Sequence, residues 1–145
     1  MPAAVSAAWK CSAYRSWSTF DPRCGSQNTN GTHVNRTVPC VVPALGCVES
    51  QVTGTFEGTA LTVITSFDPA TQLFTGTVTN FLTNGAVIHN TIALRAGVPG
   101  SVITITGGTR QFAHATGTSV TTPPTADGPG TSVGEYCLGN GGDGD

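Results

Sequence analysis

Charge is scarce in this chain, and the little that it carries is spread out. Of the 145 residues 10% are charged, the six basic residues form no cluster, and lysine occurs once, at Lys10. A protein surface that follows a phosphate backbone needs a stripe of basic residues, so we expect no nucleic-acid partner. Apolar runs are short as well. None approaches the roughly 18–20 residues of a membrane-spanning helix, so we expect no membrane span.

The sequence also lacks patterns that carry common catalytic and cofactor chemistry. No strand-to-helix turn is predicted that could present a nucleophilic serine. The glycine pair Gly107-Gly108 leads into a predicted strand, whereas a phosphate-binding loop leads into a helix. We therefore expect no bound cofactor.

Four of the five cysteines fall within the first 47 residues, where turn and loop residues dominate. Their gaps are wider than the about two to four residues that usually separate paired zinc ligands, and Cys40 and Cys47 are the nearest pair, so we expect disulfides and no metal site. Three pairings of these four are possible, of which Cys11–Cys24 with Cys40–Cys47 is the simplest. The fifth cysteine, Cys137, either pairs back to the N-terminal segment or is a free or intermolecular thiol.

The composition indicates an exported protein. Disulfides persist in oxidising compartments, and Thr, Ser, Asn and Gly are abundant, so we expect a secreted or extracellular location. The first ten residues lack the charged and apolar regions of a signal peptide, so either the sequence starts after a removed signal or the protein is cytoplasmic with reduced cysteines. Two sequons, Asn30-Gly-Thr and Asn35-Arg-Thr, make Asn30 and Asn35 candidate glycosylation sites.

β-strand patterns begin at Gln51 and continue to residue 138. Alternating and β-branched segments are separated by turns such as Asp68-Pro69 and Asn84-Gly85, which predicts an antiparallel meander. Residues 1–50 form a loop-rich block, in which residues 8–17 are a strand or a short helix, and residues 139–145 are a flexible tail. The expected strands cover residues 52–57, 61–67, 73–82, 86–94, 102–105, 111–120 and 133–138.

Residues 105–117 read ITGGTRQFAHATG, which resembles the signature of allene oxide cyclase-like and dirigent barrels: apolar-x-Gly-Gly-Thr-Gly-x-Phe-x-x-Ala-x-Gly. Arg110 stands where that pattern has its third glycine. The similarity covers residues 51–138. It implies an all-β fold, an antiparallel up-and-down barrel of about eight strands, here forming a single domain over residues 1–138 with the disulfide-braced, loop-rich residues 1–50 packed on it. It also implies that Phe112 anchors a glycine-built corner in the core.

Candidate site residues follow from strand alternation and from the expected barrel rims. His114 shares its alternation with the buried Phe112, so it is expected to point inward near one barrel end, and Arg110 places a cation at a rim. These two are the candidate catalytic residues, although a purely structural role for His114 stays open. His89 alternates with Ile88 and Asn90 and is expected to face outward or to line a channel mouth. The candidate ligand-binding residues are Phe112, His89, Arg95 and Glu135.

Two functions fit these expectations. The resemblance implies that an apolar small molecule binds in the lumen, where the barrel could guide a non-redox cyclisation or a stereoselective coupling by holding one conformer and excluding water. Alternatively, the chain is an extracellular structural or assembly subunit with a packed, non-catalytic barrel, and self-association makes it a homo-oligomer. The volume of the lumen distinguishes the two, because a packed subunit has none to spare.

Overall fold

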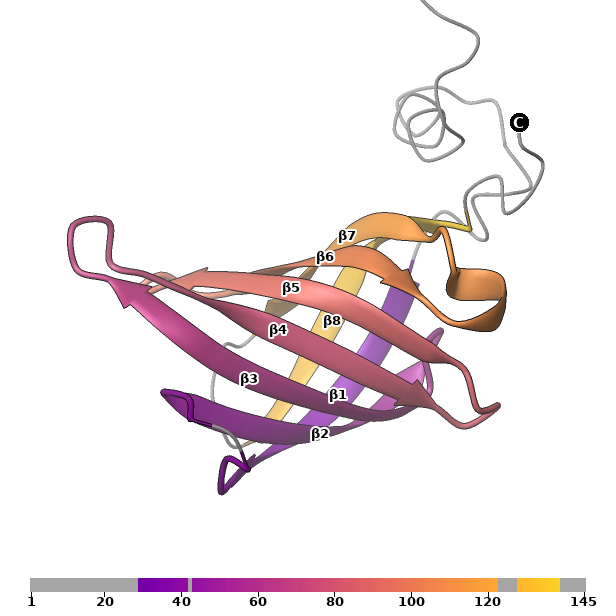
Figure 1. Cartoon of the computed structure of the whole chain (residues 1–145), viewed down its shortest axis with the longest axis horizontal. Coiled ribbons are helices and arrows are strands. Elements are labelled where there is room, and N and C mark those ends of the chain that lie inside the picture. The colour runs from indigo at the N-terminus through magenta and orange to yellow at the C-terminus, as the bar shows by residue number, and fades with distance from the viewer. Residues whose placement is uncertain (1–28, 42, 123–127, 139–145) are drawn as a thin grey trace, which may run out of the picture.

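Eight antiparallel strands form a closed barrel in the computed structural model, which describes residues 29–41, 43–122 and 128–138. Each strand pairs with the next one along the chain, and β8 pairs with β1 to close the sheet (Figure 1). The predicted all-β, up-and-down barrel of about eight strands is therefore confirmed. Within the described ranges, no helix has the length and apolar character needed to cross a membrane. The strands are β1 (Thr29–Val38), β2 (Gly46–Gly54), β3 (Gly58–Asp68), β4 (Leu73–Leu82), β5 (Val87–Arg95), β6 (Ser101–Gly108), β7 (Thr116–Thr122) and β8 (Gly128–Cys137).

Short turns connect β3 to β4 and β4 to β5 at the predicted positions. After β3, the carboxylate of Asp68 accepts a hydrogen bond from the backbone N–H of Ala70 (2.9 Å). After β4, the side-chain oxygen of Asn84 accepts one from the N–H of Ala86 (2.9 Å), and Gly85 has a φ of 93°, which favours glycine. These local bonds define both hairpins because they satisfy donors that the sheet does not pair.

Residues 29–50 correct the prediction of a loop-rich block packed on the barrel. They contain β1 and the first part of β2, and these strands pair with each other, with β8 and with β3, so they belong to the barrel wall. The predicted local disulfide Cys40–Cys47 is confirmed; it ties the β1–β2 connection to β2, with Cα atoms 5.4 Å apart. The predicted pair Cys11–Cys24 and the predicted tail over residues 139–145 lie outside the described residues.

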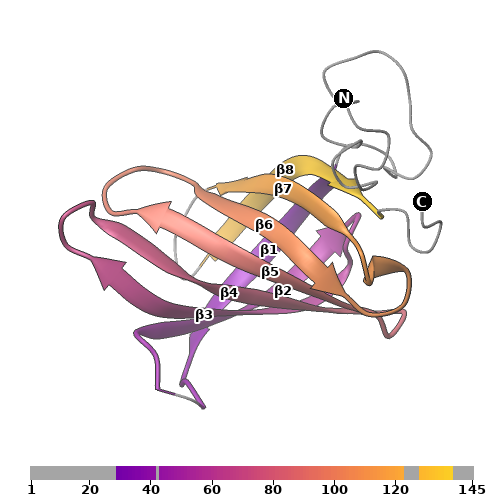
Figure 2. The same ribbon diagram turned by 45° about the horizontal axis from the view of Figure 1, so that its top comes forward.

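The corner between β6 and β7 contains the predicted glycine pair and buried phenylalanine. A Cβ atom at Gly108 would overlap the carbonyl oxygen of Val87, so glycine is required for this approach between β5 and β6. Phe112 is 6% exposed and fixes the corner in the core. The strand predicted over residues 111–120 is wrong in its first half, where Arg110–Phe112 forms the short 3-10 helix η2 before β7 begins (Figure 2).

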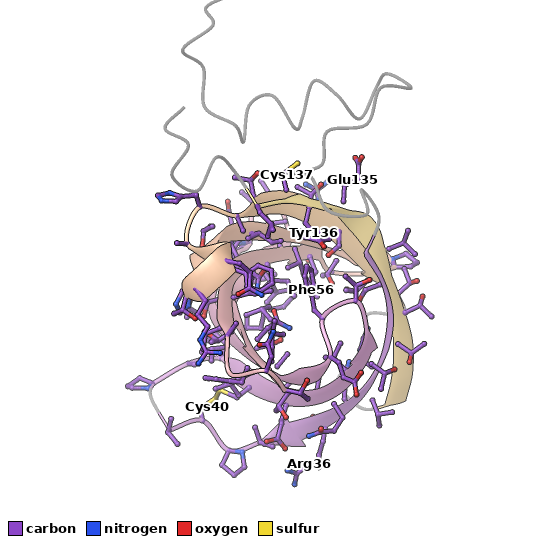
Figure 3. All side chains as sticks on the ribbon, turned by 90° about the vertical axis from the view of Figure 1, so that its right-hand side faces the viewer. Arg36, Cys40, Phe56, Glu135, Tyr136 and Cys137 are labelled. Atoms are coloured by element: carbon purple, nitrogen blue, oxygen red, sulfur yellow. A yellow bond between two sulfur atoms is a disulfide. The ribbon has the colours of Figure 1, made fainter. Side chains whose placement is uncertain are left out.

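Side chains fill one end of the barrel and leave the adjoining part of the lumen open. At the filled end the ring of Phe56 lies between two others, with its centroid 5.8 Å from that of Phe112 and 5.0 Å from that of Tyr136 (Figure 3). We call this end the plug. It consists of the buried residues Ala86, Ile88, Ile105, Phe112 and Ala115, against which Phe56, Leu82, Tyr136 and Leu138 pack.

Candidate functional site

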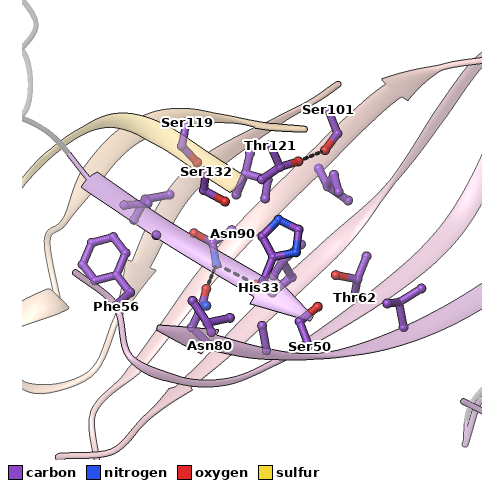
Figure 4. Close-up of a pocket in the computed structure, with 18 of the residues that line it drawn as sticks. His33, Ser50, Phe56, Thr62, Asn80, Asn90, Ser101, Ser119, Thr121 and Ser132 are labelled. Carbon is purple, nitrogen blue, oxygen red and sulfur yellow. Dashed lines mark hydrogen bonds between the residues drawn. The ribbon is translucent and has the colours of Figure 1, made fainter. Parts of the chain in front are cut away.

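A cavity of about 270 Å³ occupies the lumen beside the plug (Figure 4). All eight strands contribute to its wall, because alternate residues of each strand face the inside of a barrel. Phe56 closes the cavity on the side of the plug. Most of its exposed surface is apolar, although polar residues also line it; the aliphatic residues include Val48, Val52, Ile64, Val78, Ile92 and Ile103.

Three polar side chains of β1 and β2 form a chain of hydrogen bonds in this wall. The hydroxyl of Ser50 donates to Oδ1 of Asn35 (2.7 Å), and the same oxygen lies 2.8 Å from Nδ1 of His33. His33 and Asn35 are two residues apart on β1 and so point to one side of the sheet, while Ser50 stands opposite Asn35 in the register. Because Oδ1 can only accept, Nδ1 of His33 carries the hydrogen, and the neutral ring has its lone pair on Nε2.

The other ring nitrogen of His33 is buried without a partner. His33 is 8% exposed, and its Nε2 has no hydrogen bond to any residue that the structure describes. The ring lies over Gly130, its register partner on β8, where a Cβ atom would be 2.5 Å from Cε1 and 2.8 Å from Nε2. Gly130 thus leaves the space that the ring occupies. A buried acceptor of this kind costs free energy unless a donor reaches it.

Other buried polar groups of the wall bond to one another. Asn90 is 5% exposed and donates from Nδ2 to the carbonyl oxygen of Val78 (2.9 Å) and to Oδ1 of Asn80 (2.7 Å) (Figure 4). The hydroxyls of Ser101 and Thr121 bond to each other across β6 and β7. Both hydrogens of the Asn90 amide are therefore engaged by the protein, which contrasts with the bare Nε2 of His33.

The cavity wall carries very little charge. Among its described residues none is lysine or arginine, and the one acidic residue, Glu135, has its side chain on the outward face of β8. The described arginines Arg36, Arg95 and Arg110 are exposed. Nowhere in residues 29–41, 43–122 and 128–138 do three histidine, cysteine, aspartate or glutamate side chains gather in a group that could hold a metal ion. Because a buried charge needs a partner, this wall suits a neutral molecule.

The two predicted catalytic residues lie outside the cavity. The alternation with Phe112 predicts an inward His114, but His114 is exposed. The cause is η2: a 3-10 helix has about three residues per turn, so residues two apart no longer share a face. Arg110 is also exposed; it has a φ of 56°, and its Nη1 donates to the carbonyl oxygen of Asn84 (2.6 Å). Arg110 therefore joins the β6–β7 corner to the β4–β5 hairpin.

Of the four predicted ligand-binding residues, only Glu135 is among those that line the cavity, but its side chain shares the outward face of β8 with the exposed Val133 and points away from the lumen (Figure 3). Phe112 belongs to the plug and does not line the cavity. His89 is exposed on β5, as its alternation predicts, and Arg95 is exposed at the end of the same strand. The structure therefore does not bring these four side chains together.

Two further predictions concern covalent chemistry. Cys137 is disulfide-bonded, which excludes the predicted alternative of a free thiol there. Asn35 forms part of the cavity wall and accepts a hydrogen bond from Ser50. A glycan on Asn35 would compete with this bond for the side-chain amide, and the glycosylation of Asn35 stays a prediction. Asn30 lies in β1, and its glycosylation stays a prediction.

Most polar wall residues were not predicted from the sequence. The exception is Asn90, whose alternation with Ile88 and Ile92 on the core face is confirmed. His33 and Asn35 fall in a segment that the sequence indicates as a loop, because its polar residues hide the strand. The signal that could have found them is their spacing of two, which places both side chains on one face of any strand.

Ser132 also borders the cavity, within the sequence Gly130-Thr131-Ser132-Val133-Gly134. These residues have the spacing of the Gly-x-Ser-x-Gly motif of serine hydrolases. However, they lie inside β8, whereas the motif acts on a sharp turn between a strand and a helix. The spacing alone therefore does not make Ser132 a nucleophile.

Together, these features allow the lumen to enclose a small molecule, to keep water from most of its surface and to meet it with one buried acceptor. No protein-family model, curated protein or solved structure matches the chain. The function is therefore argued from the lumen itself.

Proposed function

We propose that the barrel binds one neutral, mainly apolar small molecule in its lumen. The observation that carries this proposal is the cavity of about 270 Å³, whose exposed wall surface is mainly apolar. Its volume is close to the lower end of the roughly 300–1,000 Å³ of small-molecule sites, and an eight-stranded barrel is wide enough for one small ligand. Affinity would come from apolar surface removed from water, at about 25 cal/mol per Å² before the costs of association.

A packed structural subunit is the competing proposal. Such a subunit would fill its lumen with side chains to the density of a normal core, and the open volume beside Phe56 and Ile92 argues against it. Self-association is independent of the lumen and stays a prediction.

Guidance of a cyclisation or coupling, which the resemblance to allene oxide cyclase-like and dirigent barrels implies, would use the same lumen. The wall would select one conformer of the substrate by shape and exclude water from it. His114 and Arg110 would not take part, because both are exposed away from the cavity wall. This extension rests on the resemblance and on the enclosed shape of the site.

Filling the lumen tests the proposal. Thr62 of β3 points into the cavity (Figure 4), and Thr62→Phe would occupy part of its volume. We expect wild-type protein to bind naphthalene, followed by its fluorescence and by protein NMR shifts, and Thr62→Phe to lose that binding. The matched control is Thr91→Phe, since Thr91 is exposed on β5, and it should bind as the wild type does. Unchanged binding by a folded Thr62→Phe variant would place the site elsewhere.

A further inference from the structure

We infer that the lumen recognises its ligand through a hydrogen bond from the ligand to Nε2 of His33, which makes the preferred ligand a neutral, mainly apolar molecule with one hydroxyl or similar donor group. This inference rests on the proposed function, because it names the ligand class for the same cavity. It is carried by His33, a residue that lines the cavity and whose buried Nε2 has no partner among the described residues.

The hydrogen-bond chain on β1 and β2 determines which group the ligand must offer. Asn35 Oδ1 already accepts from Ser50, and it accepts from Nδ1–H of His33 as well, at 2.8 Å. Nε2 of the neutral imidazole is then an acceptor, and a ligand must donate to it. These hydrogen bonds also orient the imidazole ring, because Asn35 and Ser50 belong to the paired strands β1 and β2.

The surroundings of His33 make the bond selective. Most of the exposed wall surface is apolar, so a ligand without a donor would bury Nε2 unpaired and lose affinity. An anionic ligand is disfavoured, because no lysine or arginine lines the cavity to pair with its charge. The arrangement therefore selects an alcohol or phenol over both a hydrocarbon and a carboxylate of the same shape.

Three probes of one shape separate these possibilities: 2-naphthol, 2-methylnaphthalene and 2-naphthoate. We expect 2-naphthol to bind to the wild type with a Kd about tenfold below that of 2-methylnaphthalene, the ratio typical of one buried hydrogen bond, and 2-naphthoate to bind most weakly. In ¹⁵N NMR of the imidazole groups, 2-naphthol should shift the Nε2 signal of His33. The signals of the exposed His89 and His114 should stay in place.

A variant that removes the acceptor completes the test. His33→Phe keeps an aromatic ring over Gly130 but has no acceptor, so 2-naphthol and 2-methylnaphthalene should bind to it equally. The matched control, His89→Phe, should keep the tenfold preference. If His33→Phe does not fold, the wild-type NMR titration decides, since an unmoved Nε2 signal with 2-naphthol bound would overturn the inference.

The outcomes distinguish this inference from the proposed function. If neither neutral probe binds to the wild type, the proposed function fails. If both bind equally well, the lumen is a binding site but His33 does not select its ligand. Tighter binding of 2-naphthoate than of 2-naphthol would show that the lumen recognises an anion, and the inference would be overturned.

Discussion

The plug and the open lumen are enclosed by one sheet, yet they use their inward-facing positions differently. In the plug, Ile88 and Phe112 are buried in one cluster, and the ring of Phe112 meets that of Phe56. Further along β5, Asn90 is held by hydrogen bonds and Ile92 borders the cavity. The strand β5 thus places Ile88 in the plug, and it places Asn90 and Ile92, its next two inward-facing residues, in the wall of the cavity. The difference teaches that the packed core and the open cavity are separated along the axis of this barrel.

The largest expected effect comes from truncating Ile88 in the plug. Ile88 is 1% exposed and surrounded on all sides, so Ile88→Ala should lower the free energy of unfolding by about 4 kcal/mol, in the upper part of the range for such substitutions. Denaturant unfolding followed by circular dichroism measures this change. It should leave the relative binding of naphthalene probes unchanged in the folded protein.

Ile92→Ala is the matched variant in the open lumen. Ile92 faces inward from the same strand, but one side of it already borders the cavity, so fewer packing contacts are lost and the cost should be about 2 kcal/mol. Binding of naphthalene should weaken, because part of the apolar wall is gone. Equal losses of stability in the two variants would contradict the division between plug and lumen.

A smaller effect on stability, but a specific one on binding, is expected from Gly130→Ala. The new Cβ atom would meet the ring of His33 and the carbonyl oxygen of Thr122 (3.1 Å), and such overpacking costs about 1–3 kcal/mol. The displaced imidazole should also lose much of the preference for 2-naphthol over 2-methylnaphthalene. Paired titrations of these probes measure that loss.

Gly46→Ala is the control for this substitution, because an added Cβ at Gly46 meets no atom within 4 Å. It should keep the wild-type ligand preference and change the free energy of unfolding by less than about 1 kcal/mol. An unaltered 2-naphthol preference in Gly130→Ala, with the His33 ring still in place by NMR, would mean that Gly130 does not position the ring.

The same division explains which strands could be predicted from the sequence. From β3 to β6 the inward positions are mostly apolar, so alternation indicates these four strands correctly. In β1 the pattern is inverted: Gly31, His33 and Asn35 line the cavity, while Val34 is 60% exposed on the outside. Periodicity assumes an apolar inner face, so it misses the strand whose inner face is polar. The missed strand therefore carries the candidate site, as local rules are often broken where function requires it.

The prediction that His114 faces inward near the β6–β7 corner was wrong for a different reason. Alternation places His114 beside Phe112 only if the segment is extended, and η2 interrupts it. The sequence does contain a sign of this interruption, because the resembled pattern has a glycine at the position of Arg110. Glycine favours left-handed backbone conformations, and Arg110 has such a conformation, with a φ of 56°.

The smallest expected effect concerns Arg110, which holds the plug end together from outside. Arg110→Ala should lose the bond to the carbonyl oxygen of Asn84 and keep the left-handed backbone, which lowers the free energy of unfolding by about 1 kcal/mol. Arg110→Gly loses the same bond but relieves the backbone cost, so its stability should stay close to that of the wild type. Thermal unfolding of the two variants measures the difference. If the alanine and glycine variants are equally stable, the left-handed backbone at this corner costs nothing, and the bond to Asn84 alone explains why an arginine stands there.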